Sequence, residues 1–112
     1  MGILSFLKRR RNARYAARAA KEVAERSYAA VLGRVRRRAT TMRTAEARGY
    51  VRSRSLEIVH RELAAVHNGH IKLDPAIQTE IISQATEAVV VRVLAELRSV
   101  PKAGKPDRRQ AA

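Results

Sequence analysis

Apolar side chains recur at helical spacing in three stretches of the chain, and the last stretch is the clearest. Asp74 is a preferred N-cap residue, Pro75 suits a first helical position, and Pro101 is expected to end the helix. The pattern therefore predicts a helix over 75–100, and its breadth indicates burial on more than one side, as in a central helix or a dimer interface. The apolar positions are Ile77, Ile81, Ala85, Val89, Val93 and Leu97, widened by Ile82, Val90, Leu94 and Val100.

A second helix is predicted over 41–67, because its apolar residues alternate at spacings of three and four and Asn68-Gly69 is a typical C-terminal signal. Arg52 is the one charged residue in this expected seam. The connection 68–73 is short, so the second and third helices are expected to form an antiparallel hairpin. The expected seam residues are Met42, Ala45, Gly49, Arg52, Leu56, Val59, Leu63 and Val66.

The first helix, predicted over 13–38, has an apolar stripe that consists mostly of alanine. Alanine favours the helix but buries little area, and apolar burial contributes only about 25 cal/mol per Å². We therefore expect this helix to dock weakly on the hairpin, or to become fully ordered only with a partner. The stripe residues are Ala16, Ala17, Ala20, Ala24, Tyr28, Val31 and Val35.

Together these patterns predict an all-α, three-helix protein built on the hairpin of helices two and three, with a basic N-terminal helix. A chain of 112 residues has room for one domain, which we place at 13–100. Residues 1–12 are expected to form a short amphipathic and basic segment, and residues 101–112 a disordered basic tail. A dimeric bundle remains an alternative to the monomer.

Composition changes this picture, because the charge is extreme and unevenly distributed. The chain carries 24 Lys and Arg against 10 Asp and Glu, a net charge of +14. Residues 1–54 hold 16 of the basic residues and only three acids. The absence of cysteine excludes disulfides, thiolate metal sites and cysteine nucleophiles. With no Trp, one Phe and three Tyr, aromatic stacking on bases is at most a minor contribution.

Most of the basic residues are arginines, and nine of them form two clusters within residues 9–38. The planar guanidinium fork suits phosphate, although a GC-rich genome would produce the same bias toward Arg. A solvated helix face is the other simple interpretation, but so much like charge destabilises a compact state. We predict a nucleic acid partner, DNA or RNA, bound mainly through the phosphate backbone. The residues expected to bind it are Arg9, Arg10, Arg11, Arg14, Arg18, Arg34, Arg36, Arg37 and Arg38.

Two other functions are compatible with the same pattern. The first is a peripheral membrane adaptor, in which residues 3–11 form an amphipathic anchor on anionic lipid through Ile3, Leu4, Phe6 and Leu7. Those four side chains would alternatively cover the apolar end of the bundle. The second is a structural subunit of a larger assembly, or a homo-oligomer, whose basic half meets an acidic protein. A mitochondrial-type presequence over residues 1–21 is a minor alternative to the expected cytoplasmic location, with or without peripheral attachment to a membrane.

We find no catalytic constellation in the sequence, so we expect a protein that is not an enzyme and needs no cofactor. The chain has no glycine-rich phosphate loop, nucleophile elbow or spaced carboxylate pair. His60, His67 and His70 are near one another in sequence, but nothing else in the chain supports a zinc site. We interpret them as solvated or capping side chains and predict no metal.

Overall fold

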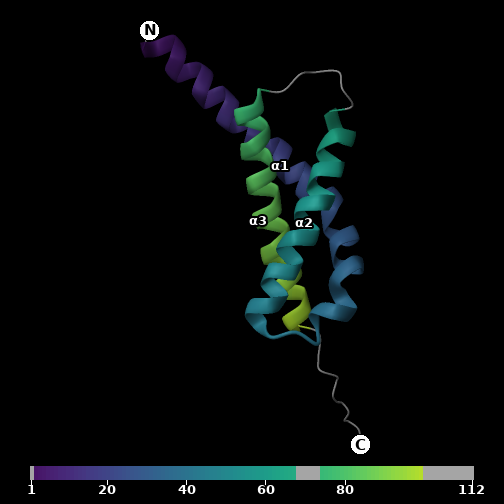
Figure 1. Ribbon diagram of the computed structural model, residues 1–112. Helices are drawn as coiled ribbons and strands as arrows, with labels where there is room; N and C mark the ends of the chain where they lie inside the picture. The colour runs from purple at the N-terminus through teal and green to yellow at the C-terminus, as the bar shows by residue number, and fades with distance from the viewer. Residues whose placement is uncertain (1, 68–73, 100–112) are drawn as a thin grey trace, which may run out of the picture.

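The computed structural model describes residues 2–67 and 74–99, and these residues form three α-helices and no strand. The helices are α1 (Gly2–Ala39), α2 (Thr44–His67) and α3 (Pro75–Ser99), and each packs against the other two. In Figure 1, α1 and α3 run downward and α2 runs upward. The all-α, three-helix prediction is confirmed. The turn at 68–73 that was predicted to close a hairpin, and the tail at 101–112, lie outside the described residues.

The start of α3 agrees with the sequence signals. The backbone N–H of Ala76 donates to Oδ1 of Asp74 at 2.8 Å, and the N–H of Gln78 donates to the Asp74 carbonyl at 3.0 Å. Asp74 is therefore the N-cap, and Pro75 takes the first helical position, where no N–H is required.

The turn between α1 and α2 fixes the end of the arginine-rich helix. The Thr40 hydroxyl donates to the carbonyl of Arg37 at 2.9 Å, and the Thr41 hydroxyl donates to that of Arg38 at 2.8 Å. Carbonyls in the last turn of a helix have no partner within it, so these bonds satisfy them. The second helix consequently begins at Thr44 instead of the predicted 41.

Arg43 is the N-cap of α2, although arginine is not a typical capping residue. Its carbonyl accepts from the N–H of Ala47 at 2.8 Å, and its own N–H donates to Oε1 of Glu46 at 3.3 Å. Glu46 thus makes the carboxylate half of a capping box, three residues after the cap.

The first helix differs from its prediction in both length and packing. It begins at Gly2 instead of 13 and ends at Ala39. It packs on α2 and α3 more extensively than those two helices pack on each other, which the alanine-rich stripe did not predict. Ala17 of the predicted stripe is exposed. The small alanines allow close approach, and Val23, Val31 and Val35 supply the larger buried side chains. Its buried residues are Ala16, Ala19, Ala20, Val23, Ser27, Val31, Val35 and Ala39.

In the first half of α2, the residues predicted to form the seam are not the ones that face the core. Ala45, Gly49, Arg52 and Leu56 are exposed, whereas Val59 and Leu63 are buried as expected. A second set of α2 residues, also three or four positions apart, faces the core instead. That set contains one serine where the predicted seam contained an arginine, and burying a hydroxyl costs far less than burying an unpaired guanidinium. The buried residues of α2 are Ala47, Val51, Ser55, Ile58, Val59 and Leu63.

The third helix has the apolar face that its sequence predicted. Ile81, Ala85, Val89, Val90 and Val93 are buried, and Ile77, Ile82, Leu94 and Leu97 pack partly buried against the same core. Val91, on the other side, is 53% exposed. The core shared by all three helices consists mainly of valine, isoleucine and alanine, together with Leu63.

Candidate anion-binding surface on α1

The nine arginines predicted to bind phosphate are all exposed on α1. None of them forms a salt bridge within residues 2–67 and 74–99. We call Arg9, Arg10, Arg11, Arg14 and Arg18 the first cluster, and Arg34, Arg36, Arg37 and Arg38 the second cluster. Arg18 and Arg34 are separated by about 24 Å along the axis, at 1.5 Å per residue. The structure thus places both clusters on one helix but does not bring them together.

Four other arginines are paired with acids, and three of these pairs join different helices. Arg26 meets Glu62 at 3.2 Å, between α1 and α2, and Arg52 meets Glu87 at 2.7 Å, between α2 and α3. The sequence placed Arg52 in the seam, but its side chain lies outside the core in this pair. Exposed pairs of this kind contribute little to stability, because solvent and salt screen them.

Arg92 joins α3 to α1 through two contacts. Its Nη1 lies 3.4 Å from Oε1 of Glu25, and its guanidinium carbon lies 3.8 Å from the centroid of the Tyr28 ring. The fourth pair, Arg54 with Glu57 at 3.0 Å, lies within α2. Arg52 and Arg54 are thus both engaged in ion pairs.

Arg52 also perturbs the ionisation of its partner. The hydrogen bond from its guanidinium, together with its charge, lowers the pKa of Glu87 below the ordinary value of 4.5, with a smaller contribution from the charge of Arg48. Glu87 is thus held in its ionised form. This pair neutralises Arg52, whereas the arginines of the two clusters have no acidic partner within residues 2–67 and 74–99.

The charges and dipole of α1 do not stabilise the first cluster. The first turn of α1 contains no acidic residue, although a helix N-terminus favours negative charge. Arg10, Arg14 and Arg18 follow one another at four-residue intervals, and each such like-charge pair destabilises a helix by roughly 0.2–0.5 kcal/mol. An anion bound along this face would relieve that repulsion.

The second cluster, in contrast, has a structural role as well. Arg36, Arg37 and Arg38 lie in the last turn of α1, where the helix dipole favours positive charge by about 0.3–1 kcal/mol per residue. The fold also brings Arg43, at the start of α2, and Arg98, in the last turn of α3, to this end of the bundle (Figure 1). Sequence reasoning did not connect Arg98 with this group, because only the direction of α3 places it there.

The two clusters face different sides of α1, because the buried line turns around the helix. From Ser27 onward the buried residues recur every four positions, at Ser27, Val31, Val35 and Ala39. Four residues at about 100° each overshoot one turn by about 40°, so three such steps rotate the buried line by about 120°. The exposed side rotates with it. One short, straight ligand therefore cannot contact both clusters equally.

The start of α1 extends beyond the bundle. Among the described residues of α1, Ala16 is the first that is buried, and Figure 1 shows the preceding turns projecting past the start of α3. The predicted anchor residues lie on this projection and are exposed: Ile3 by 76%, Leu4 by 80%, Phe6 by 57% and Leu7 by 48%. The alternative in which these four residues cover the apolar end of the bundle is therefore wrong.

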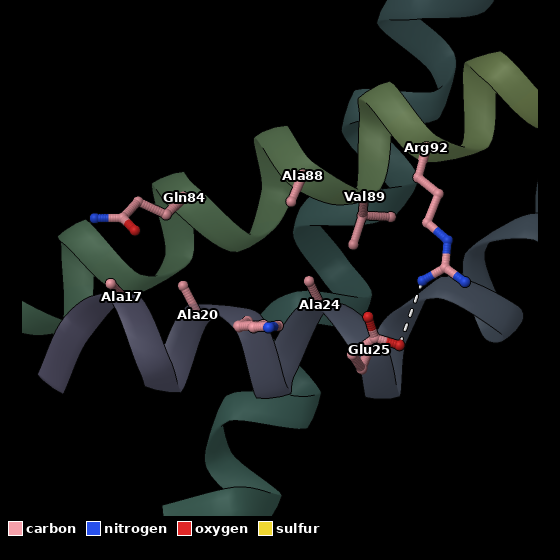
Figure 2. A pocket seen from close by; sticks show the side chains of 9 residues that line it. Ala17, Ala20, Ala24, Glu25, Gln84, Ala88, Val89 and Arg92 are labelled. Atoms are coloured by element: carbon pink, nitrogen blue, oxygen red, sulfur yellow. Dashed lines mark hydrogen bonds and ion pairs between the residues drawn. The ribbon is translucent and has the colours of Figure 1, made fainter. Parts of the chain in front are cut away.

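A shallow hollow lies between α1 and α3 and is lined largely by small side chains (Figure 2). Its volume is about 260 Å³, and Ala17, Ala20, Ala24 and Ala88 form much of its wall. The ion pair between Glu25 and Arg92 crosses one end. The hollow follows from packing two helices through alanine, and its polar lining consists of Lys21, Glu25, Gln84 and Arg92.

The described residues show neither a metal-binding group nor a helix that could span a membrane. Among the described residues, no group of three or more His, Cys, Asp or Glu side chains is positioned to hold a metal ion. His60 is exposed on α2, while the side chain of His67 and all of His70 lie outside the described part. None of the three described helices combines the length and apolar character needed to cross a bilayer.

Comparison with known proteins finds no matching family model, no similar curated protein and no similar solved structure. The exposed arginines of α1 are therefore the main indication of function.

Proposed function

We propose that this protein binds nucleic acid, mainly through contacts between the phosphate backbone and the arginines of the first and second clusters, and that it acts without catalysis. The observation that carries this proposal is the contrast between two sets of arginines. Arg26, Arg52, Arg54 and Arg92 each meet a carboxylate, whereas the nine cluster arginines are exposed and unpaired among the described residues. Their charge is thus available to an external anion.

Nucleic acid suits this surface because its charge is dense, linear and regularly spaced. Duplex DNA carries one negative charge per roughly 1.7 Å of axis, and each phosphate that a protein neutralises releases condensed counterions. α1, with 38 residues, is about 57 Å long at 1.5 Å per residue. A ligand that meets both clusters must therefore be extended, and it must bend or present two strands, since the clusters face different sides. Phosphate contacts carry no base information, so we expect weak sequence preference.

The first experiment measures affinity for a mixed-sequence duplex by fluorescence anisotropy as a function of salt. A duplex of about 20 base pairs is about 68 Å long, which exceeds the length of α1. If five phosphates are neutralised, the slope of log affinity against log salt should be about −4.5, from about −0.9 per phosphate. A slope near zero would refute the proposal.

Charge-matched variants then locate the contact. Arg10→Gln/Arg14→Gln/Arg18→Gln removes three unpaired charges of the first cluster, and Arg36→Gln/Arg37→Gln/Arg38→Gln removes three of the second. Each should reduce the slope by about 2.7 where all three residues contact phosphate. The matched control, Arg26→Gln/Arg52→Gln/Arg54→Gln, removes the same charge from paired positions.

The control should change the slope less than either cluster variant. Equal loss of affinity in all three variants would show that only net charge matters, and would contradict a binding surface on α1. Recovery of the full chain with a fixed protein partner that persists after nuclease treatment, together with a flat salt slope, would favour the assembly-subunit alternative.

Dimerisation through the third helix receives little support from the described surface. Val91 is the large apolar residue that α3 leaves exposed, and one valine is a small part of the ~800 Å² per partner that a standard interface buries. Sedimentation equilibrium of the wild type and of Val91→Lys tests the hypothesis. A dimer that the substitution dissociates would support an interface on this side of α3.

A further inference from the structure

The exposed apolar residues at the start of α1 have no function in the bundle or in phosphate binding. We call Ile3, Leu4, Phe6 and Leu7 the apolar tip. They are four of the six large apolar side chains that are exposed in the described structure, and Ile3 and Leu4 are exposed by more than three quarters. The other two, Leu56 and Val91, lie singly on α2 and α3. Single exposed apolar residues are ordinary, but four within five positions form a patch that calls for a partner.

The apolar tip is continuous with the first cluster on one side of α1. At about 100° per residue, the four tip residues occupy an arc of about 160° around the helix. Arg10, Arg11, Arg14 and Arg18 fall within the same arc, one to four turns further along. This side is opposite the line of Ala16, Ala20 and Val23 that packs into the core. The outer side of α1 therefore presents an apolar patch followed directly by an unpaired basic stripe.

We propose that the apolar tip inserts into the headgroup region of an anionic membrane while the arginines of the first cluster bind lipid phosphates. An amphipathic helix is held at a bilayer surface by buried apolar area together with attraction to anionic lipid. Each basic residue near such a surface strengthens binding about fivefold. The tip supplies the apolar area, the stripe supplies the charge, and both lie on the side of α1 that faces away from the bundle.

Other occupants fit this patch less well. A phosphate backbone offers apolar side chains no favourable contact, so nucleic acid explains the stripe but not the tip. A second copy of the chain would bring Lys8, Arg9, Arg10 and Arg11 close to their equivalents and would add like-charge repulsion to any apolar contact. An anionic lipid surface satisfies both parts at once.

This inference goes beyond the proposed function and does not depend on it. Leu7 and Arg34 are separated by about 40 Å along α1, several times the Debye length of about 8 Å at physiological salt. The second cluster consequently remains free for nucleic acid when the tip is on a membrane. If both proposals hold, the two ends of one helix contact two different anionic partners.

Flotation with lipid vesicles tests the proposal on the full chain. We compare vesicles of phosphatidylcholine mixed equally with phosphatidylglycerol and vesicles of phosphatidylcholine alone. The test variant is Ile3→Gln/Leu4→Gln/Phe6→Gln/Leu7→Gln, since glutamine keeps the helix propensity and the tip makes no core contact. Loss of four insertable side chains should weaken binding to the anionic vesicles by about 100-fold or more. The matched control, Val91→Gln, removes a side chain of similar exposure from α3 and should bind as the wild type does.

Two further measurements separate charge from insertion and lipid from nucleic acid. Arg10→Gln/Arg14→Gln/Arg18→Gln should weaken binding to anionic vesicles by about 100-fold, from about fivefold per residue, and phosphatidylcholine alone should bind poorly. The glutamine variant of the tip should retain its affinity for the duplex. Unchanged flotation of the tip variant would overturn the proposal. The proposal would also be overturned if the tip variant lost duplex affinity or self-association but still bound vesicles.

Discussion

Replacing Val31 with alanine tests whether α1 is an integral part of the bundle, on which the position of the two clusters relative to α2 and α3 depends. Val31 is fully buried on α1, and Val91 provides a matched control because it is 53% exposed on α3. Both substitutions remove the same atoms from the middle of a helix. Both also gain the same helix propensity, up to about 0.7 kcal/mol. Their difference therefore reports burial alone.

The expected magnitude follows from the two exposures. Val31→Ala removes the equivalent of two buried methylene groups, a loss of about 1.6 kcal/mol at about 0.8 kcal/mol each. The cavity that remains raises the cost to about 2–2.5 kcal/mol, and the propensity gain reduces it to about 1.5–2 kcal/mol. Val91 is about half exposed, so Val91→Ala loses roughly half as much burial free energy, and the gain in helix propensity nearly cancels this loss.

Urea unfolding monitored by circular dichroism measures both free energies of unfolding on the full chain. The free energy of unfolding of Val31→Ala should lie about 1.2–1.7 kcal/mol below that of Val91→Ala. Its Tm should be lower by about 5–14 °C, at about 4–8 °C per kcal/mol for a domain of this size. Equal stability of the two variants would refute the reasoning. It would mean that α1 does not dock as described and that the positions of the two clusters are not fixed by the bundle.

Three further predictions concern single features of the fold. Arg52→Gln should raise the pKa of Glu87 toward 4.5, as measured by NMR titration, and an unchanged pKa would contradict the pairing. Because the pKa of Glu87 is lowered in the folded state, the stabilisation from this pair is present above about pH 4.5 and is lost as the pH falls through the lowered pKa. Ser55→Ala should leave the free energy of unfolding in urea unchanged or raise it by about 1 kcal/mol, since the buried hydroxyl has no hydrogen-bond partner among the described residues. A clear loss of stability would contradict this and indicate that the hydroxyl has a hydrogen-bond partner. Asp74→Ala should lower Tm through a loss of about 1 kcal/mol, whereas Asp74→Asn keeps a capping oxygen and should not; similar losses in both would contradict the N-cap.

The sequence predicted the third helix best because several independent signals coincide there. The capping aspartate and Pro75 mark its start, and the apolar period of Ile81, Ala85, Val89 and Val93 matches the buried face. The second helix offered two sets of positions at the same spacing, and hydrophobicity alone favoured the wrong one. The choice depended on which positions meet α1 and α3, where a small Ser55 fits the core and Arg52 reaches Glu87 instead.

The exposed arginines of the candidate surface were predictable because charge keeps a side chain in water whatever the fold. Which of them remain unpaired was not, because pairing depends on acids far away in sequence, as between Arg92 and Glu25. The sequence also left open whether the apolar tip would cover the bundle. The length of α1 decided this, since the helix extends beyond its first buried residue, Ala16, and holds the tip away from the core.

The sequence by itself therefore determined the helices, the basic character of α1 and the chemistry of its two ends, because these are local properties of spacing and charge. The tertiary structure alone decided that α1 is packed into the bundle and that its buried line turns along its length. It also brought Arg43 and Arg98 toward the second cluster. The physical reason is that contacts between helices depend on which faces are presented to one another. That choice balances side-chain size, burial and pairing across the whole molecule.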